Sequence, residues 1–460
     1  MRRAEAEQIS GRHCGSGGGL RRRAGRACAL LGLLGLVVAL PGGCGRGESA
    51  PRNLLLITVD TLRSDHLGAW GYGRGTSPAI DALAAGGVVF EDAYSHTSWT
   101  LPSLATLMTS LYTSSHGAWD FKSKLPESVT TLAEILTGRG YRSGAVVTHV
   151  FAGRKYGMHQ GFVEFDEDLV VDGIRAHVQI TSPRVTAKGL EWIRRRAGEE
   201  QPWFLWLHYF DPHGEYMEHP GISAAFGREE KRDLYDGEIA FTDRAIGSLL
   251  RGLEELGRAG DTVVVLTADH GEEFAEHGRT RHGKTLYEEV IRVPLIVRAP
   301  GLAPGRVQGA VPSVDLLPTL LELMDLPAPA GIEGASLVAA MEGAPLEARP
   351  VLGELRAMAF KDADSYRRGR WKVIREGWRQ RDHLYDLETD PAEQVDLAAE
   401  HPDRLERMLR EMDALRGAAR GAASASPKPE QDLNLTPDEL EGLRQLGYLE
   451  EEDKVEEQGK

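Results

Sequence analysis

The body of this 460-residue chain lacks cysteine, because Cys14, Cys28 and Cys44 all lie near the N-terminus. Beyond residue 44 this excludes a disulfide framework and metal sites built on cysteine pairs. The chain also lacks positive charge: the net charge is −15, and the arginine-rich segment 1–43 leaves about −20 for the remainder. A general nucleic-acid binder needs a basic surface and is therefore excluded. An anionic substrate remains compatible, since a bound cation and a few local cations set the potential inside a pocket.

Long apolar runs are absent after the N-terminal segment. The run 27–40 follows four arginines within 21–26 and precedes the sequence PGGC. This order is typical of a secretory signal, and the run is too short to span a membrane comfortably. The small residues before Cys44 resemble a bacterial lipoprotein signal, although Pro41 stands where that motif usually has leucine. We therefore expect 1–43 to be a signal peptide, either ordinary, uncleaved or of the lipoprotein type. The body would be exported to the periplasm or cell envelope, with membrane attachment only at the N-terminus.

From residue 53 to about residue 300, apolar strand-like runs alternate with helical patterns. The strand-like runs are LLLITVD, GGVVF, YRSGAVV, PWFLWLHYF, DTVVVLTAD and VPLIVRAP. This alternation predicts an α/β fold in which a large, mostly parallel sheet is sandwiched by helices. We assign residues 52–345 to a catalytic domain on this basis.

The C-terminal part of the chain has a different pattern. Short segments indicate a small antiparallel α+β subdomain over 346–417, closed by the helix EHPDRLERMLREMDALRG. An acidic tail follows over 418–460. Only LTPDELEGLRQLGYLE in this tail looks helical, with Thr436 as the N-cap and Glu439 three residues later.

Two apolar runs end abruptly in polar residues beside a candidate nucleophile. ITVDTLRSDH and TVVVLTADHGEEFAEHG show no alternation and predict strands buried on both faces. Ligands bind at the carboxyl ends of such strands, where Asp60, Asp269 and His270 fall. Thr100, in SHTSWTLPSLATLMTSLYTSSHG, would stand on the first turn of a helix. Each signal alone is weak, since such a threonine is most often a helix cap. Together they predict a divalent cation held by Asp60, Thr100, Asp269 and His270.

These motifs, in this order, resemble the sulfatase family within the alkaline phosphatase superfamily over roughly residues 52–400. ITVDTLRSDHLGAWGY resembles the opening strand and its metal-binding acids, and WTLPSLATLMTSLYTSSHG resembles the nucleophile helix. HYFDPHGEY, TADHGEEFAEHG and RHGKTLYEEVIRVPLIVRAPG resemble the substrate, metal and anion-binding segments. GRWKVIREG and LYDLETDPAEQVDLA resemble the closing subdomain. The resemblance implies a metal-dependent ester hydrolase.

The departures from the family pattern concern the nucleophile and its neighbours. Sulfatases carry Cys or Ser, x, Pro, x, Arg, and the first residue is oxidised to formylglycine. Here the stretch is TLPSL, 100–104, so formylglycine cannot form and the arginine is missing. Thr61 replaces the second acid of the first strand, and Thr148 replaces the lysine of the second family signature. Superfamily relatives with a threonine nucleophile are phosphodiesterases and phosphoethanolamine- or glycerophosphate-transferring enzymes, which implies phosphoryl chemistry.

A threonine hydroxyl must be activated by a base or a metal. A cation held by Asp60, Asp269 and His270 would lower the pKa of the Thr100 hydroxyl and neutralise charge on the transferred group. We expect attack by Thr100, a covalent phosphothreonine, and completion by water or another alcohol. His270 stands where sulfatases often have asparagine, which favours manganese or zinc over calcium.

His213, His282 and Lys284 are further candidates for catalysis. By resemblance, the mid-chain histidine and the late lysine contact the anionic group and help to protonate the leaving oxygen. Alternatively, Asp211, His213 and His282 could hold a second metal, as an aspartate and two histidines do in two-metal members of the superfamily. The spacing in the sequence does not decide between these roles.

Three functional hypotheses follow. The first is an exported metal-dependent hydrolase or transferase that acts on phosphoesters through Thr100. The second keeps the chemistry but takes sulfate esters, and the third is an inactive relative that binds anionic glycans or lipids. The substrate would be a small anionic ester, free or linked to a lipid or glycan. Loops 150–185 and 213–232 are the expected source of specificity.

Overall fold

The computed structural model describes residues 53–170, 180–356, 362–423 and 433–445. The predicted signal segment with Cys44, the end of the acidic tail and part of the loop 150–185 lie outside these residues. Within them, no helix is both long enough and apolar enough to cross a membrane.

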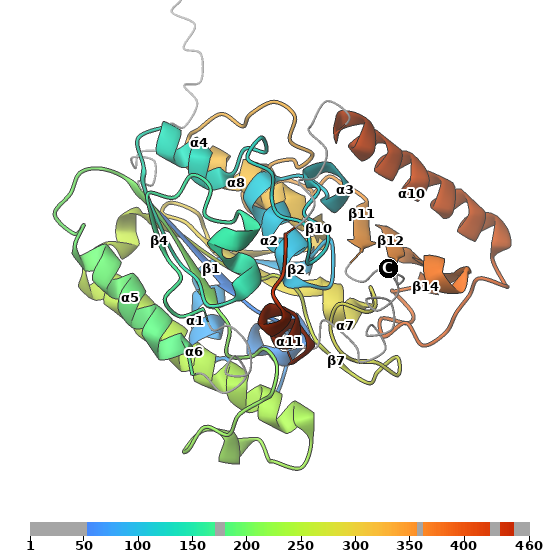
Figure 1. Ribbon diagram of the computed structural model, residues 1–460, viewed down its shortest axis with the longest axis horizontal. Coiled ribbons are helices and arrows are strands. Elements are labelled where there is room, and N and C mark those ends of the chain that lie inside the picture. Colours follow the sequence, from blue (N-terminus) through green and yellow to red (C-terminus); the bar gives the residue numbers. More distant parts are fainter. Residues whose placement is uncertain (1–52, 171–179, 357–361, 424–432, 446–460) are drawn as a thin grey trace, which may run out of the picture. The chain divides into compact units, whose positions relative to one another are not determined.

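An eight-stranded sheet forms the centre of the fold (Figure 1). In spatial order its strands are β10 (Gly305–Pro312), β2 (Val88–Tyr94), β9 (Arg292–Arg298), β6 (Thr262–Ala268), β1 (Asn53–Val59), β5 (Trp203–Tyr209), β3 (Arg142–Val146) and β4 (Glu164–Asp166). Neighbouring strands run parallel, except that β9 is antiparallel to both β2 and β6. Every residue of β1, β5 and β6 is buried, as expected for strands covered on both faces. The predicted large, mostly parallel α/β sheet is confirmed.

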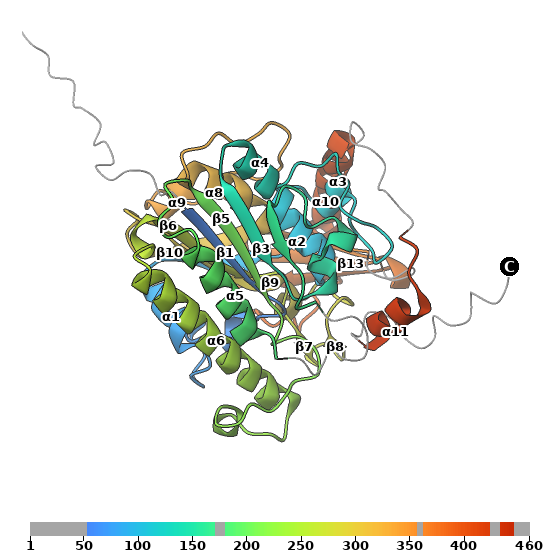
Figure 2. The same ribbon diagram turned by 60° about the vertical axis from the view of Figure 1, so that its left-hand side comes forward.

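Helices cover both faces of this sheet (Figure 2). One face carries α1 (Pro78–Ala85), α5 (Ser182–Arg194) and α6 (Lys231–Glu255), and the other carries α2 (Thr100–Thr109), α4 (Leu132–Gly138) and α8 (Leu316–Leu323). Three shorter helices are α3 (Thr113–His116), α7 (Glu288–Ile291) and α9 (Val338–Met341). Helix α5 buries Val185, Gly189, Trp192 and Ile193, a helical spacing that turns one side of the helix towards the sheet.

A four-stranded antiparallel sheet follows the main sheet in the chain. Its strands are β11 (Val351–Leu355), β12 (Ala363–Arg368), β13 (Trp371–Glu376) and β14 (Arg381–Asp386). Helix α10 (Pro402–Ala423) packs Met408 and Met412 into the same apolar cluster as Tyr366 and Leu384 of this sheet. The predicted C-terminal antiparallel sheet and its closing helix are therefore confirmed.

Two smaller elements complete the described residues. The hairpin of β7 (Glu273–Phe274) and β8 (Thr280–Arg281) follows β6 in the chain. Helix α11 (Pro437–Gln445) begins as predicted, because the Glu439 N–H donates to Thr436 Oγ1 and the Thr436 N–H donates to Glu439 Oε2.

Gly144 in β3 provides a test of the packing between the sheet and α5. A Cβ atom at this position would lie 2.4 Å from Cε2 of Trp192. We expect Gly144→Ala to lower the free energy of unfolding by about 1–3 kcal/mol, since the indole must shift within a packed core. Urea denaturation measures this change. The control is Gly138→Ala at the end of α4, where a Cβ meets nothing within 4 Å. Equal midpoints for the two variants would contradict the packing argument.

Candidate active site

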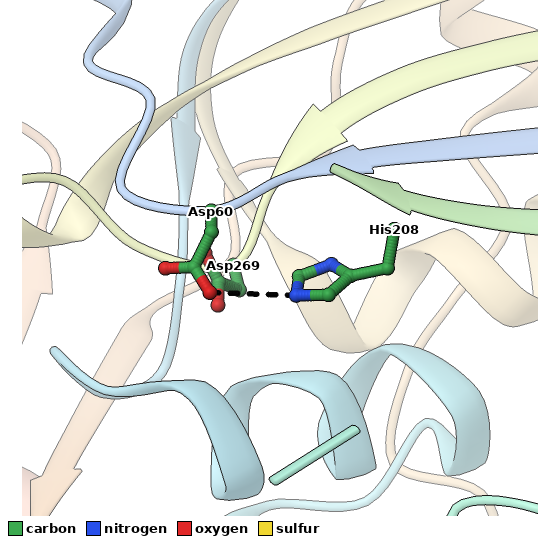
Figure 3. A group of neighbouring side chains, drawn as sticks. All are labelled: Asp60, His208 and Asp269. Carbon is green, nitrogen blue, oxygen red and sulfur yellow. Dashed lines mark ion pairs between the residues drawn. The ribbon is translucent and has the colours of Figure 1, made fainter. Parts of the chain in front are cut away.

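Three adjacent strands each bring one polar side chain to the same edge of the sheet. Asp60 follows β1, Asp269 follows β6, and His208 is the last residue but one of β5. The strands are parallel and in register, with Val59 paired with Ala268 of the neighbouring strand. The three side chains therefore converge, as Figure 3 shows.

The converging atoms form a buried donor set. One ligand atom from each of Asp60, His208 and Asp269 lies within 4.8 Å of the others, and all three residues are fully buried. His208 Nε2 is 3.4 Å from Asp60 Oδ2. Among the described residues, both Asp60 oxygens, Asp269 Oδ2 and His208 Nε2 lack hydrogen-bond partners. Buried carboxylates without partners are costly unless a cation balances them. Two carboxylates and one imidazole therefore fit a divalent cation.

His208 is held in an orientation that suits a metal ligand. Its Nδ1 lies 2.8 Å from Thr58 Oγ1, which also accepts a hydrogen bond from Trp206 Nε1 at 2.9 Å. Burial lowers the pKa of His208 to about 4, so the ring is neutral at neutral pH. A neutral imidazole that donates from Nδ1 to Thr58 presents the lone pair of Nε2 to the two carboxylates.

His270 and Thr100 adjoin this donor set. His270 Nε2 lies 3.8 Å from Asp60 Oδ1 and 3.5 Å from Asp269 Oδ2, and Thr100 Oγ1 is 3.3 Å from the same nitrogen. His270 Nδ1 is 3.0 Å from the carbonyl oxygen of Gly271. Since a carbonyl only accepts, Nδ1 carries a proton and Nε2 faces the cluster. The structure thus brings together all four residues that the sequence predicts for the metal site.

Thr100 is the first residue of α2 and directly follows the N-cap position. Trp99 occupies the N-cap position with an extended backbone and no capping hydrogen bond from its side chain. Ser103 donates a hydrogen bond of 2.5 Å to the carbonyl of Asp269, which ties the first turn of α2 to the end of β6. The N-terminus of α2 therefore faces the carboxylate cluster, where the helix dipole favours a bound anion.

Thr61, where the resemblance implies a lost metal carboxylate, has a strained backbone. Its φ of 55° lies in the left-handed region, which a β-branched residue rarely adopts. Its N–H donates to Asp269 Oδ1 at 3.2 Å, and its carbonyl accepts from the Tyr235 hydroxyl at 2.6 Å. The strain is thus held by contacts that join the ends of β1 and β6 to helix α6, as is common at functional sites.

The cluster is electrostatically unfavourable without a counter-charge. Burial raises the pKa of Asp60 well above its usual range, and the Asp269 carboxylate raises it further, while His270 opposes the shift. Metal-free protein therefore favours a protonated Asp60, and a bound cation would replace that proton.

A second group of polar side chains lies beside the first. His282 Nδ1 donates to Glu272 Oε1 at 3.1 Å, and the Tyr216 hydroxyl donates to Glu272 Oε2 at 3.0 Å. The ring centroids of His282 and His270 are 4.5 Å apart, and those of His282 and His213 are 4.8 Å apart. The hydrogen bonds from Tyr216 to Glu272 and from His282 to Glu272 fix the orientation of the His282 ring. Both predicted histidines, His213 and His282, therefore lie close to the candidate metal ligand His270.

His149 extends this group. It follows β3, and its ring centroid lies 5.4 Å from that of His213 and 6.5 Å from that of His208. Burial lowers its pKa well below the usual range, and the charges of His208, His282 and His270 lower it further. The preceding Thr148 does not face an anion site, because its hydroxyl donates to the carbonyl of His208 at 2.8 Å.

The loop with His282 is bonded to the loop that precedes Thr100. The Gly283 N–H donates to the carbonyl of Ser98 at 2.8 Å. Lys284, predicted to contact the anionic group, is half-buried. Burial raises the pKa of the nearby Glu273 carboxyl, and the charge of Lys284 offsets part of this rise. The structure thus places Lys284 on the same loop as His282, and its role stays a prediction.

Asp211, predicted as one possible ligand of a second metal, has a structural role in the described residues, and its part in a second metal site stays a prediction. Its Oδ1 accepts from the N–H and hydroxyl of Thr181 at 2.7 and 2.6 Å, and its Oδ2 accepts from the Ser182 N–H at 2.6 Å. The carboxylate therefore caps the start of α5. Among the described residues, the group of three that could hold a metal is the one formed by Asp60, His208 and Asp269.

Sequence reasoning missed His208, His149 and Glu272. His208 lies inside an apolar strand, where a histidine looks like a buried structural residue. The sequence feature that could have indicated a site residue is its position one residue before the end of the strand. His149 ends another strand-like run, GAVVTH, and offered the same signal. Glu272 lies within TADHGEEFAEHG but shows no sign of its partner, since His282 is ten residues away and reaches it only through the loop.

The chain combines a mostly parallel α/β sheet with a buried set of two carboxylates and one imidazole that could hold a divalent cation. Residues 52–326 match the family model described as Sulfatase, and residues 275–416 match the model described as N-sulphoglucosamine sulphohydrolase, C-terminal. The chain therefore belongs to the sulfatase family and is a sulfatase-family ester hydrolase, which confirms the predicted family.

Individual relatives agree with this assignment. Arylsulfatase A of Homo sapiens is 30% identical over 349 residues, which cover 64% of this chain and 68% of the relative. A phosphonate monoester hydrolase of Agrobacterium radiobacter shares the fold with a TM-score of 0.68 and 20% identity, over 80% of this chain and 96% of that chain. A 2-O GAG sulfatase has a TM-score of 0.66 and 21% identity, over 83% of this chain and 95% of that chain.

Asp60→Asn tests whether the cluster is built for a cation. Because the folded state raises the pKa of Asp60, this group makes the free energy of unfolding of metal-free protein fall as the pH rises from about 4 through the folded pKa. At pH 8 in chelator we therefore expect Asp60→Asn to melt at a higher temperature than wild type. Excess manganese or zinc should raise the melting temperature of wild type but not of Asp60→Asn.

The matched control is Glu255→Gln, which neutralises an exposed carboxylate on α6 and should leave both responses unchanged. Differential scanning calorimetry with metal analysis gives both readouts. If no divalent metal changes the melting temperature of wild type, the assignment of these residues as metal ligands is contradicted.

Proposed function

We propose that this protein is a metal-dependent hydrolase of phosphoesters, with transfer to another alcohol as a variant of the same chemistry. The observation that carries the proposal is the buried Thr100 hydroxyl, placed at the N-terminus of α2 and 3.3 Å from Nε2 of His270. Threonine cannot be converted to formylglycine, so a sulfatase-family enzyme with threonine at this position must use the hydroxyl directly.

Asp60, Asp269, His208 and His270 are the residues that would hold the metal. When bound, a divalent cation supplies positive charge that lowers the pKa of a neighbouring hydroxyl and neutralises the transferred group. The two imidazoles beside two carboxylates favour zinc or manganese over calcium, which prefers oxygen ligands alone.

The protein side chains then account for the positioning of the reaction. The Thr100 hydroxyl loses its proton to solvent, and Oγ1 attacks phosphorus to form a covalent phosphothreonine while the bond from phosphorus to the leaving oxygen breaks. The N-terminus of α2 stabilises the negative charge on the non-bridging oxygens. Water then attacks phosphorus, the bond from phosphorus to Thr100 Oγ1 breaks, and this oxygen takes up a proton from solvent. The product is phosphate from a monoester substrate and a phosphate monoester from a diester substrate.

His282 is the proposed proton donor for the leaving alcohol. The Glu272 carboxylate accepts from Nδ1 and so fixes the ring, which lies against the rings of His270 and His213 on the histidine side of the site. His213 lies against His282 and would contact the anionic group from the same side. In the second step, His282 would take a proton from the attacking water.

The proposal also covers the class of substrate and the location of the protein. Relatives are named arylsulfatase, 2-O GAG sulfatase and phosphonate monoester hydrolase. We infer a small anionic ester, free or linked to a glycan or lipid. The basic and apolar N-terminal segment supports an exported enzyme, and Cys44 is the candidate for a lipid anchor.

Thr100→Ala tests the nucleophile. We expect the turnover of bis(4-nitrophenyl) phosphate to fall by about 1,000-fold or more, because the covalent step has no substitute. Thr100→Ser retains a hydroxyl and should keep measurable activity. Metal content and melting temperature should stay within error of wild type in both variants. Full activity in Thr100→Ala would refute the nucleophile.

The same assay separates the alternatives when 4-nitrophenyl sulfate is included and manganese, zinc and calcium are each added back. Turnover of the sulfate ester alone would identify a sulfatase with a threonine nucleophile. No turnover of either ester with any metal would favour an inactive relative that binds anionic ligands.

His282→Ala tests the proton donor through the leaving group. We expect kcat/KM to fall about 100-fold for a phenyl ester, whose leaving oxygen needs a proton, and less than about 10-fold for the 4-nitrophenyl ester. Glu272→Gln should lower kcat/KM for both esters, by a smaller factor than His282→Ala does. Equal losses for the two esters would show that His282 binds substrate without donating a proton.

A further inference from the structure

A pocket of about 370 Å³ opens between the hairpin of β7 and β8 and the start of helix α6. Its lining includes Tyr216, Glu273, Phe274 and Arg281. Two of these residues are chain neighbours of the proposed machinery: Glu273 follows Glu272, and Arg281 precedes His282. Tyr216 joins the two regions directly, because its hydroxyl donates to Glu272 Oε2. A group bound in this pocket would therefore contact Tyr216, which holds the Glu272–His282 pair.

The wall of this pocket contains a buried carboxyl with a hydrogen bond to only one of its two oxygens. Glu273 is 1% exposed, and its Oε1 accepts a hydrogen bond from the Thr285 hydroxyl at 2.9 Å. Its Oε2 is buried and has no hydrogen-bond partner among the described residues. A half-satisfied buried carboxyl is costly, so its retention in a pocket wall indicates an external partner.

The surroundings of the pocket suit an uncharged group with an apolar body. Tyr216 and Phe274 present rings whose centroids are 5.9 Å apart. The two arginines of the lining are paired, Arg281 with Glu215 at 2.7 Å and Arg232 with Glu276 at 2.9 Å, and the third cation of the lining, Lys231, is exposed to solvent. A second anionic group on the ligand would meet only this solvent-screened charge and gain little, whereas a ring could pack on the two aromatic side chains.

The hairpin of β7 and β8 has a strained backbone at Arg281. Its φ of 69° lies in the left-handed region, which an arginine rarely adopts. Its pairing with Glu273 across β7 and β8 sets the position of the buried carboxyl in the wall. Strain of this kind is most often found where a fold positions groups for a ligand.

We propose that this pocket receives the leaving group of the ester, and that Glu273 donates a hydrogen bond to an acceptor oxygen at the far end of an uncharged, ring-bearing alcohol. The proposal rests on the proposed ester hydrolysis and specifies its substrate class. Glu273 is then a specificity residue, which contacts the part of the substrate that does not react.

The ionisation of Glu273 agrees with this role. Burial raises its pKa to about 8, and the nearby carboxylates of Glu289 and Glu272 contribute to the shift. The carboxyl is therefore largely neutral at pH 7. Its Oε1 accepts from Thr285, so its Oε2 carries the proton and can donate it to a ligand oxygen.

The experiment compares two leaving groups of similar size, 4-acetylphenol with an acceptor oxygen and 4-ethylphenol without one. The esters are made as phosphate monoesters, methyl phosphate diesters and sulfates, and the series that wild type turns over is used. For each ester, the ratio of wild-type to variant kcat/KM cancels intrinsic reactivity. We expect Glu273→Leu to lose about 10-fold on the acetylphenyl ester and less than about 2-fold on the ethylphenyl ester. Glu273→Gln, which keeps an N–H donor, should stay within about 3-fold of wild type on both.

Glu333→Leu is the matched control, since it removes a partly buried carboxyl outside the pocket and should affect both esters alike. A binding measurement separates failure of this inference from failure of the proposed function. The free phenols are titrated by saturation-transfer NMR, and Glu273→Leu should weaken binding of 4-acetylphenol alone. That result would support the pocket even if no ester is turned over. Equal effects of Glu273→Leu on the two phenols or the two esters, or no binding of either phenol to wild type, would overturn the proposal.

Discussion

Two buried carboxylates that face each other are the constraint around which this fold is arranged. Asp60 and Asp269 stand at the ends of adjacent parallel strands, so the backbone hydrogen bonds of the sheet fix their separation. Neither side chain can turn away, because both are fully buried. Protonation of Asp60 relieves the repulsion in metal-free protein, and a bound divalent cation would relieve it in the loaded protein. The imidazoles of His208 and His270 lie beside the two carboxylates and would complete the donor set of a cation.

The candidate site has two halves with different supports. The metal half is built from strand ends and the first turn of α2, which are rigid because the central sheet is covered on both faces. The histidine half is built on loops, and it depends on hydrogen bonds such as those from Tyr216 to Glu272 and from Glu272 to His282. Small changes in the loops can therefore alter substrate choice without disturbing the metal half. This division fits a family whose relatives carry names for different ester substrates.

Much of this arrangement could be predicted from the sequence, because it depends on local signals. Apolar runs without alternation gave the buried strands, and acids at their ends gave Asp60 and Asp269. Parallel strands then required these ends to meet. His208 could not be recognised in this way, since a histidine inside a strand gives no sign of which neighbours it faces. Glu272 depends on a loop contact, which spacing alone does not encode. Asp211 illustrates the opposite case: an aspartate after a strand suggested a metal ligand, but its oxygens cap α5.

The four-stranded C-terminal sheet bears on both loops of the site. The Glu354 N–H of β11 donates to the carbonyl of His96, just before the Thr100 helix. Lys372 of β13, fully buried, pairs at 2.9 Å with Glu288, six residues beyond His282, and with Glu393. This sheet thus acts as a brace for the two segments that carry the proposed nucleophile and proton donor. A shortened chain ending before β11 would keep every candidate ligand and still lose the scaffold that aligns them.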